Sequence, residues 1–306
     1  MTKKIIVTGA SGLIGQNLCR ALISRGDEVF VFTRDIIKTK RIIPDAKGYI
    51  VWDYNKPSEW NEYLNDKDAV IHLAGANLSG KRWTDNYKKI ILKSRQTSTK
   101  NLVEVINSLK DKTSAFICAS GINYYGDSGD RLLTEKREPG NDFLAKVCST
   151  WEDEASLVEK AGVRRISIRT GVVLNTGYGA LRKMSLPFKF FVGGPLGNGK
   201  QWFPWIHIDD IVNVYIYALD NESLSGAINA SAPNPVTMNE FAKTLGNVMN
   251  RPSFFRVPKF LLKIAVGEVT ESITASMKVV PQKLLESGFR FKFENLKDAL
   301  EDLLKH

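Results

Sequence analysis

The feature of this sequence that most constrains its fold is a glycine-rich turn close to the N-terminus. The apolar, β-branched run of residues 4–8 leads into TGASGLIG at residues 8–15, and a helical pattern begins within that motif. Gly9 permits a tight turn, Gly12 lets the backbone approach a pyrophosphate, and Gly15 lets the helix pack close to the strand. The helix then presents free N–H groups and the positive end of its dipole to phosphate groups. The motif therefore predicts a dinucleotide-binding βαβ unit.

Strand and helix patterns alternate through the first half of the chain. Further short apolar runs predict strands at residues 28–32, 49–52, 69–73, 114–119 and 165–169. Apolar residues at helical spacing predict helices at residues 13–25, 58–64, 85–109 and 143–161. Strands separated by helices form parallel sheets with helices on both faces. We therefore predict an α/β fold of the Rossmann type, in which a doubly wound parallel sheet carries a smaller mixed C-terminal substrate cap.

The pattern changes after Thr170, where glycine and proline become frequent through residue 201. Beyond that stretch the spacing predicts helices at residues 206–219, 238–249, 296–304 and after Pro281, and a strand at residues 289–293. We predict a Rossmann domain over residues 1–175, to which residues 205–227 return. The substrate cap is predicted to consist of residues 176–204 and 228–306.

The end of the second predicted strand bears on the choice of cofactor. An NAD enzyme usually has an acidic residue there, which accepts hydrogen bonds from the ribose hydroxyls. Here the strand ends in Thr33 and Arg34, and a guanidinium pairs well with a phosphate monoester. NADP(H) is therefore predicted in preference to NAD(H). Two alternatives stay open: Asp35 could hold the ribose if Arg34 points away, and Arg34 could be a solvated surface residue.

Charge and cysteine content narrow the classes of function. The 306 residues include 43 Lys and Arg against 33 Asp and Glu, a net charge of +10, which suits a phosphorylated ligand, nucleic acid or an acidic membrane surface. The basic residues are dispersed, so a phosphate-bearing small molecule is favoured over nucleic acid.

The three Cys and three His are scattered, so no metal is predicted. Lys263 interrupts the apolar stretch at residues 260–266, so no membrane partner is expected and a cytoplasmic protein is predicted.

Four motifs resemble the extended short-chain dehydrogenase/reductase superfamily, which includes nucleotide-sugar epimerases and dehydratases. They are TGASGLIG (8–15), HLAGAN (72–77), YYG (124–126) and WIHIDD (205–210). Over nearly its whole length the chain resembles, more narrowly, the atypical branch called "epimerase family protein". The segments that carry this second resemblance are KRW (81–83), SR (94–95), VCSTWE (147–152), GGPLGNGKQWFPWIHIDD (193–210), APNPVTMNEFAK (232–243) and PQKLLESGFRF (281–291).

The resemblance implies a set of cofactor contacts. The glycine-rich turn would cradle the pyrophosphate, the end of the second strand would hold the 2′-phosphate, and the ends of the fourth, fifth and sixth strands would follow the rest of the dinucleotide. In that order, the implied residues are Gly9, Ser11, Gly12, Leu13 and Ile14, then Thr33 and Arg34, then Leu73, Ala74 and Gly75, and finally Ser120, Thr170, Gly171 and Val173. Asp53 could contact the adenine or be an exposed loop carboxylate. Arg95, on the long helix, could reach the cofactor.

The catalytic pair of the superfamily is missing. Its members place a tyrosine and, four residues later, a lysine on one helix face, where the lysine lowers the pKa of the phenol and holds the ribose. If Glu152 corresponds to the glutamate that follows this lysine by one turn, the tyrosine position is Leu144 and the lysine position is Cys148. Tyr124 and Tyr125, after the fifth strand, are the candidate catalytic residues. The alternative is that they form an aromatic wall of the pocket.

The segment 193–210 is expected on the substrate side. Gln201, Trp202 and Trp205 could line a pocket there, or the aromatic residues could be buried between domains. Asp209 or Asp210 is expected to cap the following helix. The predicted function is an NADP(H)-binding oxidoreductase or nucleotide-sugar-epimerase-like enzyme that acts on a small molecule such as a sugar or carbonyl compound. The alternative is a non-enzymatic NADP(H)-binding regulator, for example one linked to cell division, and the oligomeric state stays open.

Overall fold

Seven parallel strands form the central sheet of the computed structural model, which describes residues 2–78 and 80–305. Their order is β11-β7-β5-β4-β1-β2-β3. The order reverses between β1 and β4, and doubly wound sheets open a crevice at such a point, outside the carboxyl ends of the strands. The strands are β1 (Lys4–Thr8), β2 (Glu28–Thr33), β3 (Gly48–Val51), β4 (Ala69–His72), β5 (Ala115–Gly121), β7 (Arg164–Thr170) and β11 (Gly226–Ala230).

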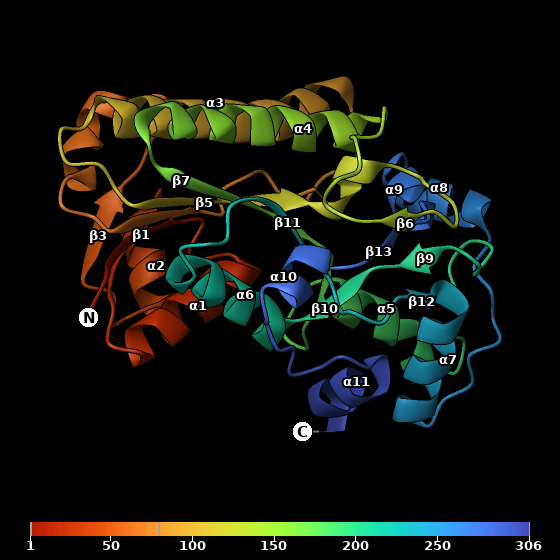
Figure 1. Cartoon of the computed structure of the whole chain (residues 1–306). Helices are drawn as coiled ribbons and strands as arrows, with labels where there is room; N and C mark the ends of the chain where they lie inside the picture. Colours follow the sequence, from red (N-terminus) through yellow and green to blue (C-terminus); the bar gives the residue numbers. More distant parts are fainter. Residues whose placement is uncertain (1, 79, 306) are drawn as a thin grey trace.

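Helices cover both faces of this sheet (Figure 1). α1 (Leu13–Ser24), α2 (Ile36–Ile42) and α6 (Ile208–Asp220) lie on one face, and α3 (Asp85–Ser108) and α4 (Phe143–Ser156) lie on the other. The predicted doubly wound α/β sheet is therefore confirmed.

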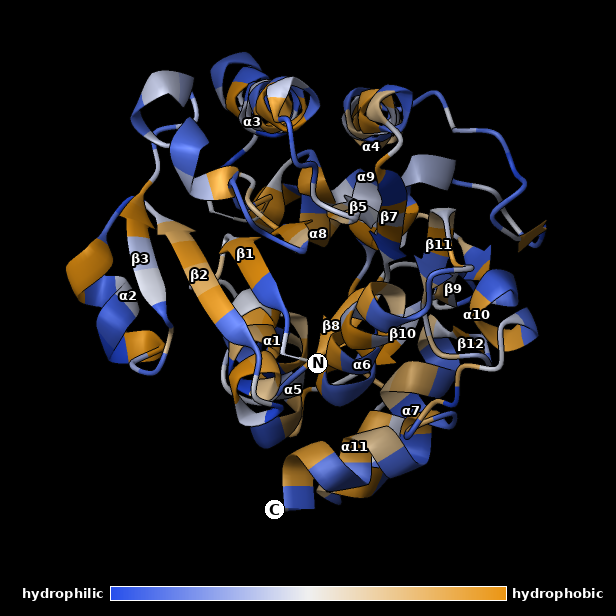
Figure 2. Cartoon of the chain, turned by 60° about the vertical axis from the view of Figure 1, so that its left-hand side comes forward, coloured by the Kyte–Doolittle hydropathy of each residue, from blue (hydrophilic) through white to orange (hydrophobic). Residues whose placement is uncertain are grey.

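The strands at the centre of the sheet are apolar on both sides. In β1, Ile5 and Val7 pack into the core on the α1 side, whereas Ile6 packs into the core on the α3 side, and all three are fully buried. Figure 2 shows β1 and β2 as hydrophobic over most of their length. A parallel strand that is covered on both faces has this continuous apolar sequence, which is why the N-terminal strands were recognisable from the sequence.

The C-terminal part adds three small two-stranded sheets beside the carboxyl ends of the main strands. β8 (Val172–Leu174) pairs with β10 (Trp205–His207), β9 (Trp202–Phe203) with β12 (Val236–Thr237), and β6 (Leu132–Leu133) with β13 (Lys278–Val279). The helices of this part are α5 (Ala180–Lys189), α7 (Met238–Met249), α8 (Lys259–Val266), α9 (Val269–Thr274), α10 (Gln282–Glu286) and α11 (Leu296–Lys305).

The strand predicted at residues 289–293 is wrong, because these described residues form no strand. Phe289, Phe291 and Phe293 are buried, and this produces the alternating pattern. The backbone N–H groups of Lys292 and Phe293 donate to the carboxylate of Asp210, at 2.7 and 3.0 Å, instead of to a neighbouring strand. Alternation here reflects side-chain burial in an irregular segment.

Several predicted boundaries shift. The helix predicted at residues 58–64 consists of two short 3₁₀ segments, Pro57–Glu59 and Asn61–Leu64. α6 begins at Ile208 and is capped by His207, whose Nδ1 accepts from the backbone N–H of Asp209 at 3.1 Å, so the predicted aspartate cap is wrong.

The predicted domain boundary after residue 227 falls inside β11, which continues in register with β7 as far as Ala230. The central sheet therefore includes the chain as far as Ala230. Within the described residues, no helix combines the length and the apolar character that crossing a bilayer requires.

Candidate functional site

The glycine-rich turn between β1 and α1 is packed against the end of β4. Gly9 has a φ of +68°, and a Cβ atom there would lie 2.7 Å from the carbonyl carbon of Leu73 and 2.8 Å from the nitrogen of Ala74. A Cβ at Gly15 would collide with the carbonyl oxygen of Gly9. Both positions therefore require glycine, one for its dihedral angles and both for close approach.

The first turn of α1 has the properties of an anion site. Its N-cap is Gly12, which has extended dihedrals and no side chain to satisfy the free N–H groups of the helix, and the first turn holds no acidic residue. Ser11 and Gly12 are exposed, and Leu13 and Ile14 are half-buried. A Cβ at Gly12 would contact only the oxygen of Gly9, at 3.2 Å. The turn therefore leaves space for a phosphate group at a helix N-terminus, and these residues fit a pyrophosphate.

At the end of β2, Arg34 and Asp35 are the two candidates for binding the adenosine end of the cofactor, and their side chains have different surroundings. Arg34 is exposed, and its side chain has no partner within the described part of the chain. Asp35 is the N-cap of α2, and its Oδ1 accepts from the N–H of Lys38 at 2.9 Å. Thr33 is buried and bonded to Thr39 through their hydroxyl groups, at 2.7 Å. The free side chain at this strand end is therefore the guanidinium.

The end of β4 is braced by a buried arginine. The Arg95 side chain donates from Nη2 to the carbonyl of Ala76, at 3.1 Å, and stacks over the ring of Trp151. A Cβ at Gly75 would lie 3.0 Å from Cζ of Arg95. Arg95 therefore lies against the predicted cofactor segment that includes Leu73, Ala74 and Gly75.

A fully buried histidine links β1 to β4 beneath this segment. His72 Nδ1 is 2.7 Å from the Thr8 hydroxyl, and that hydroxyl also accepts from the N–H of Ala74. Burial lowers the pKa of His72 to about 3, so the ring is neutral. Asp53, after β3, accepts from the N–H and side-chain amide of Asn55 and closes a local turn.

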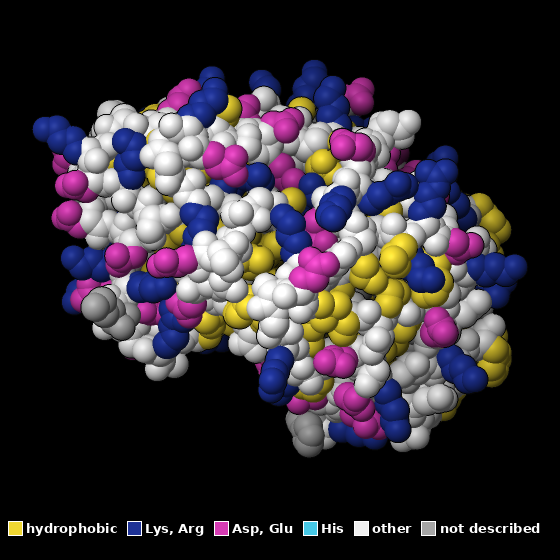
Figure 3. All heavy atoms as spheres, in the orientation of Figure 1, with side chains coloured by type: hydrophobic (Ala, Val, Ile, Leu, Met, Phe, Trp, Pro, Cys, Tyr) yellow, Lys and Arg dark blue, Asp and Glu magenta, His cyan; other side chains and the backbone are white. Residues whose placement is uncertain are grey.

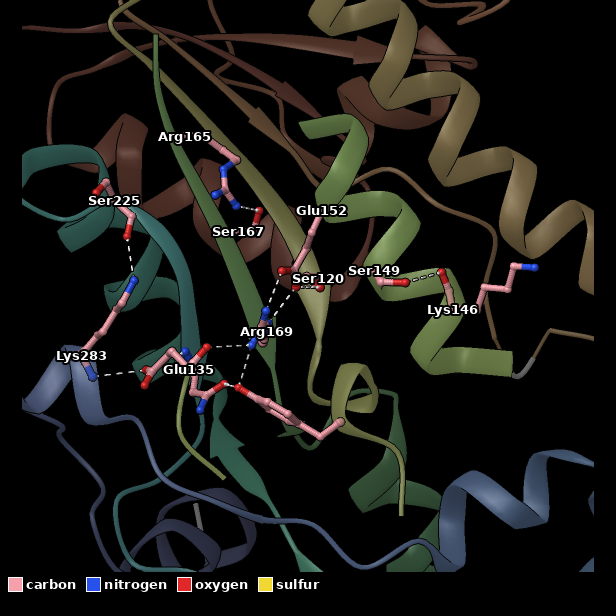
Figure 4. A network of polar contacts seen from close by, with 12 residues as sticks. Ser120, Glu135, Lys146, Ser149, Glu152, Arg165, Ser167, Arg169, Ser225 and Lys283 are labelled. Atoms are coloured by element: carbon pink, nitrogen blue, oxygen red, sulfur yellow. Dashed lines mark hydrogen bonds and ion pairs between the residues drawn. The ribbon is translucent and has the colours of Figure 1, made fainter. Parts of the chain in front are cut away.

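A buried charged network occupies the ends of β5 and β7 (Figure 4). Arg169, from β7, makes a bidentate ion pair with Glu152 of α4, at 2.9 and 2.8 Å. Ser120, from β5, donates to Oε1 of the same carboxylate at 2.7 Å. Burial alone would lower the pKa of Arg169, but the hydrogen bonds and charge of Glu152 outweigh it and raise that pKa. The guanidinium of Arg169 therefore stays charged.

The two candidate tyrosines meet this network in different ways. The guanidinium of Arg169 lies over the ring of Tyr124, 3.4 Å from its centroid, and Tyr124 stays half-buried. Tyr125 is buried, and its hydroxyl donates to Oδ1 of Asn229 at 2.6 Å and accepts from Arg169 at 2.9 Å. Burial raises the pKa of Tyr125 to about 12. The hydroxyl of Tyr125 is thus committed to internal bonds, and Tyr124 is the more accessible of the two.

The helix that carries the catalytic pair in the superfamily lies as the aligned register predicts. Leu144, Cys148 and Glu152 follow one another on the buried face of α4, and Sγ of Cys148 would be 3.6 Å from a Cβ at Gly121. Burial raises the pKa of Cys148 to about 12, so its thiol stays protonated. Lys146 is exposed and points away from Arg169 (Figure 4). Helix α4 therefore contains no tyrosine, and its one lysine does not reach the network around Arg169.

The remaining predicted cofactor residues lie where β7 leads into β8. Thr170, Gly171 and Val173 are half-buried, and the N–H of Gly171 donates to the carbonyl of Ala230 at 2.9 Å. A Cβ at Gly171 would lie 3.0 Å from the oxygen of Pro204. This segment continues the edge formed by Ser120 and the glycine-rich turn.

The structure does not bring the three predicted substrate residues to one surface. Trp205 is 1 % exposed and belongs to the main core, and Gln201 is buried and donates to the carbonyl of Leu196. Trp202 is half-buried, its Nε1 donates to Asp130 at 2.9 Å, and Nζ of Lys278 lies over its ring. Residues 127–131 line a surface cavity of about 630 Å³. Trp202 contacts one of these lining residues, Asp130.

Sequence reasoning missed the Arg169–Glu152 pair. A signal was present, since Arg169 lies in a predicted strand directly after Ile168, and Glu152 follows Leu144 and Cys148 at helical spacing. Among the described residues, no group of three or more His, Cys, Asp or Glu side chains could hold a metal ion.

Comparison with known proteins places this geometry in a family. Residues 5–230 match the NAD dependent epimerase/dehydratase family, and residues 257–303 match a domain of unknown function, DUF1731. The chain is 40 % identical over 305 residues to the chloroplastic epimerase family protein SDR39U1 homolog of Arabidopsis thaliana, covering 98 % of this chain and 86 % of that protein. It is 36 % identical over 301 residues to the epimerase family protein YfhF of Bacillus subtilis, covering 98 % and 97 %.

Solved structures agree. The human epimerase family protein SDR39U1, crystallised with NADPH, superposes with a TM-score of 0.89 at 30 % identity, covering 99 % of both chains. A nucleoside-diphosphate sugar epimerase from Corynebacterium glutamicum has a TM-score of 0.80 at 31 % identity, covering 99 % of this chain and 58 % of that one. The resemblance to epimerase family proteins is confirmed, and the chain belongs to the NAD dependent epimerase/dehydratase family.

Proposed function

We propose that this protein binds NADP(H) and uses it in an oxidoreductase or epimerase-type reaction on a small sugar or carbonyl compound. The observation that carries the cofactor choice is the end of β2, where Arg34 is free and an oxygen of Asp35 is used to cap α2. A free guanidinium favours a 2′-phosphate, whereas a ribose-binding carboxylate would favour NAD(H). The human relative crystallised with NADPH supports the same choice.

Different segments of the chain would bind different parts of the cofactor. The first turn of α1 would receive the pyrophosphate, Arg34 the 2′-phosphate, and the ends of β4, β5 and β7 the rest of the molecule. When bound, the nicotinamide supplies a carbon that can give or accept hydride. Arg95 keeps the end of β4 in place through its bond to the carbonyl of Ala76.

Tyr124 is the group that we assign to proton transfer. Burial raises the pKa of its phenol, which keeps the hydroxyl protonated and able to donate to a substrate oxygen. Arg169 lies against the ring face and is itself fixed by Glu152, so the ring is held and a phenolate formed by proton loss is stabilised. In this arrangement an arginine acts on the tyrosine from the sheet side, in place of a lysine on the helix.

A second candidate function is a non-enzymatic NADP(H)-binding regulator. The observation that favours it is the replacement of the catalytic pair by Leu144 and Cys148, both of which are buried. A chain that kept the cofactor site but used it only to sense NADP(H) would have no need of a proton donor.

Hydride transfer distinguishes the two functions. The pure chain is incubated with 4-deuterated NADPH and a panel of sugars, aldehydes and ketones, and products are examined for deuterium by mass spectrometry. We expect transfer to at least one substrate, and we expect Tyr124→Phe to slow it by about a hundredfold or more while NADPH binding is kept. Tyr63→Phe, on the exposed surface, is the matched control. Tight NADPH binding with no transfer across the panel would favour the regulator.

A further inference from the structure

Six large apolar side chains lie exposed on the C-terminal part of the molecule. They belong to the segment after α5 and to the segment that runs from α7 through α8, and each is at least 50 % exposed: Phe190, Phe191, Val192, Phe254, Phe260 and Ile264. We call these residues the apolar patch. Monomeric proteins rarely expose contiguous apolar surface on this scale unless it binds something.

The two segments of the apolar patch lie side by side. The N–H of Phe255 donates to the carbonyl of Gly193 at 3.1 Å, and the N–H of Val257 donates to the carbonyl of Pro195 at 3.0 Å. The guanidinium of Arg251 also lies over the ring of Phe191, 4.4 Å from its centroid. The two strips of chain therefore run side by side as far as Val257, and α8 follows directly after the second strip.

Helix α8 is the most unusual part of this surface. Its sequence, KFLLKIAV, is as apolar as a core helix, yet none of its eight described residues is buried. Phe260 and Ile264 are one helical turn apart and share a face, and Lys259 and Lys263 are exposed beside them. A short helix with exposed apolar residues and flanking lysines is typical of segments that lie in a membrane interface.

The two chain segments that form the apolar patch contain basic residues but no acidic ones. Residues 176–208 contain four Lys or Arg and residues 241–267 contain five, and neither segment contains an Asp or Glu. Of these nine basic residues, only Lys259 makes an ion pair with a described residue, Glu271. Figure 3 shows hydrophobic and basic side chains along the right-hand part of the molecule, with acidic side chains among them, where Figure 1 has α8 and the segment that leads to it.

We propose that the apolar patch docks on the surface of a membrane that contains anionic lipids. Apolar side chains would enter the interface while the surrounding Lys and Arg contact lipid headgroups. A second copy of the chain is a poorer occupant, because a self-complementary interface would bring the basic residues of these segments against the same basic residues of the other copy. No membrane partner was expected from the sequence because Lys263 prevents residues 260–266 from spanning a bilayer, but that limit does not apply to a helix that lies in the interface.

The docking surface is connected to the proposed cofactor site. Nη2 of Arg82, from the segment between β4 and α3, donates to the carbonyl of Ile264 at 2.8 Å. Lys88 of α3 makes an ion pair with Glu268, between α8 and α9. The helix that would touch the membrane thus contacts the segment that follows the end of β4.

Vesicle flotation tests the proposal with the full chain. Vesicles of phosphatidylcholine alone are compared with vesicles that also contain phosphatidylglycerol. We expect the wild-type chain to float with the anionic vesicles and to be released at high salt, since screening weakens charge contacts at the surface. Absence of binding to the anionic vesicles at low salt would overturn the proposal.

Two pairs of double variants locate the surface. Phe260→Ser/Ile264→Ser is expected to weaken vesicle binding by at least tenfold, whereas Tyr63→Ser/Leu157→Ser, which removes exposed apolar residues elsewhere, is expected to bind like wild type. All four sites are exposed, so folding is checked by an unchanged melting temperature. Equal binding by both variants would contradict a role of the apolar patch.

The second pair tests charge. Arg256→Glu/Lys263→Glu is expected to weaken binding to anionic vesicles by at least tenfold. Lys110→Glu/Lys160→Glu makes the same change in net charge on another surface and is expected to keep most of the wild-type binding. Light scattering at matched protein concentration measures whether the wild-type chain and the Phe260→Ser/Ile264→Ser variant are monomers or dimers. A wild-type dimer that Phe260→Ser/Ile264→Ser dissociates would show that a second copy covers the apolar patch, and would overturn the membrane proposal.

Discussion

The guanidinium of Arg169 lies 3.4 Å from the centroid of the Tyr124 ring, and the same guanidinium is held by the carboxylate of Glu152. Both charged residues are buried, Arg169 near the end of β7 and Glu152 on α4. A buried charge is tolerated only while its partner is present, because an unpaired charge in the interior has a large desolvation cost. The position of Tyr124 therefore depends on an ion pair in which neither partner can be replaced alone without leaving a buried, unpaired charge.

Removing one member of this pair should destabilise the fold strongly. Arg169→Met leaves the carboxylate of Glu152 buried and unpaired, and we expect a loss of about 3–5 kcal/mol in the free energy of unfolding. The double variant Arg169→Met/Glu152→Leu leaves no charge behind and should regain much of that loss. Urea denaturation measures both values. A double variant that is no more stable than Arg169→Met would contradict this account.

Arg34 should determine the preference for the phosphorylated cofactor. Arg34→Ala removes the free guanidinium at the end of β2, and we expect NADPH affinity to fall roughly tenfold or more while NADH affinity stays the same. Arg41→Ala, which removes another exposed arginine on α2, is the control for net charge. An unchanged ratio of NADPH to NADH affinity in Arg34→Ala would show that another group reads the phosphate.

Gly9 should be intolerant of a side chain for two separate reasons. Gly9→Ala combines the strain of a positive φ with contacts of 2.7–2.8 Å to the backbone of Leu73 and Ala74. Gly162 has a similar positive φ, +77°, but no atom lies within 4 Å of a Cβ added there. Gly162→Ala should therefore lose only about 1 kcal/mol of folding stability, from the strain of the positive φ. Melting curves should therefore show a clearly larger loss for Gly9→Ala. Equal losses would mean that the turn relaxes away from β4.

His72 should make the fold sensitive to acid. Its pKa is about 3 in the folded protein, against an ordinary value of 6.5, so between these values the unfolded chain binds the extra proton. Stability contributed by neutral His72 is therefore complete above pH 6.5 and is lost as the pH falls, by up to about 1.4 kcal/mol per pH unit. Urea unfolding of wild type and His72→Gln between pH 7 and pH 4 checks this. A variant with the same slope as wild type would assign the acid sensitivity to other groups.

The sequence predicted the central sheet well because its signals are local. The strand β1, the glycine turn and α1 are adjacent in the chain, and a parallel strand buried on both faces, such as that containing Ile5, Ile6 and Val7, is recognisable without knowledge of its neighbours. Helix α7 was predicted with its observed limits from its helical spacing, and in the structure a capping box formed by Thr237 and Glu240 marks its start.

The small sheets beside the central sheet were less predictable because their pairing depends on distant contacts. The strands β6 and β13 are two residues long and more than 140 residues apart, so neither has a local signal. The alternation of Phe289, Phe291 and Phe293 suggested a strand, but Asp210 on α6 satisfies the backbone of this segment. In the same way, Trp205 appeared suited to a pocket until the pairing of β10 with β8 placed it in the core.

Uptake of nicotinamide coenzymes by the wild-type chain tests the central claim most directly. Isothermal titration of the folded protein with NADPH and, separately, with NADH measures both affinities under the same conditions. The account predicts saturable binding at one site per chain, with NADPH bound roughly tenfold or more tightly than NADH. Well-folded protein that binds neither coenzyme would contradict it.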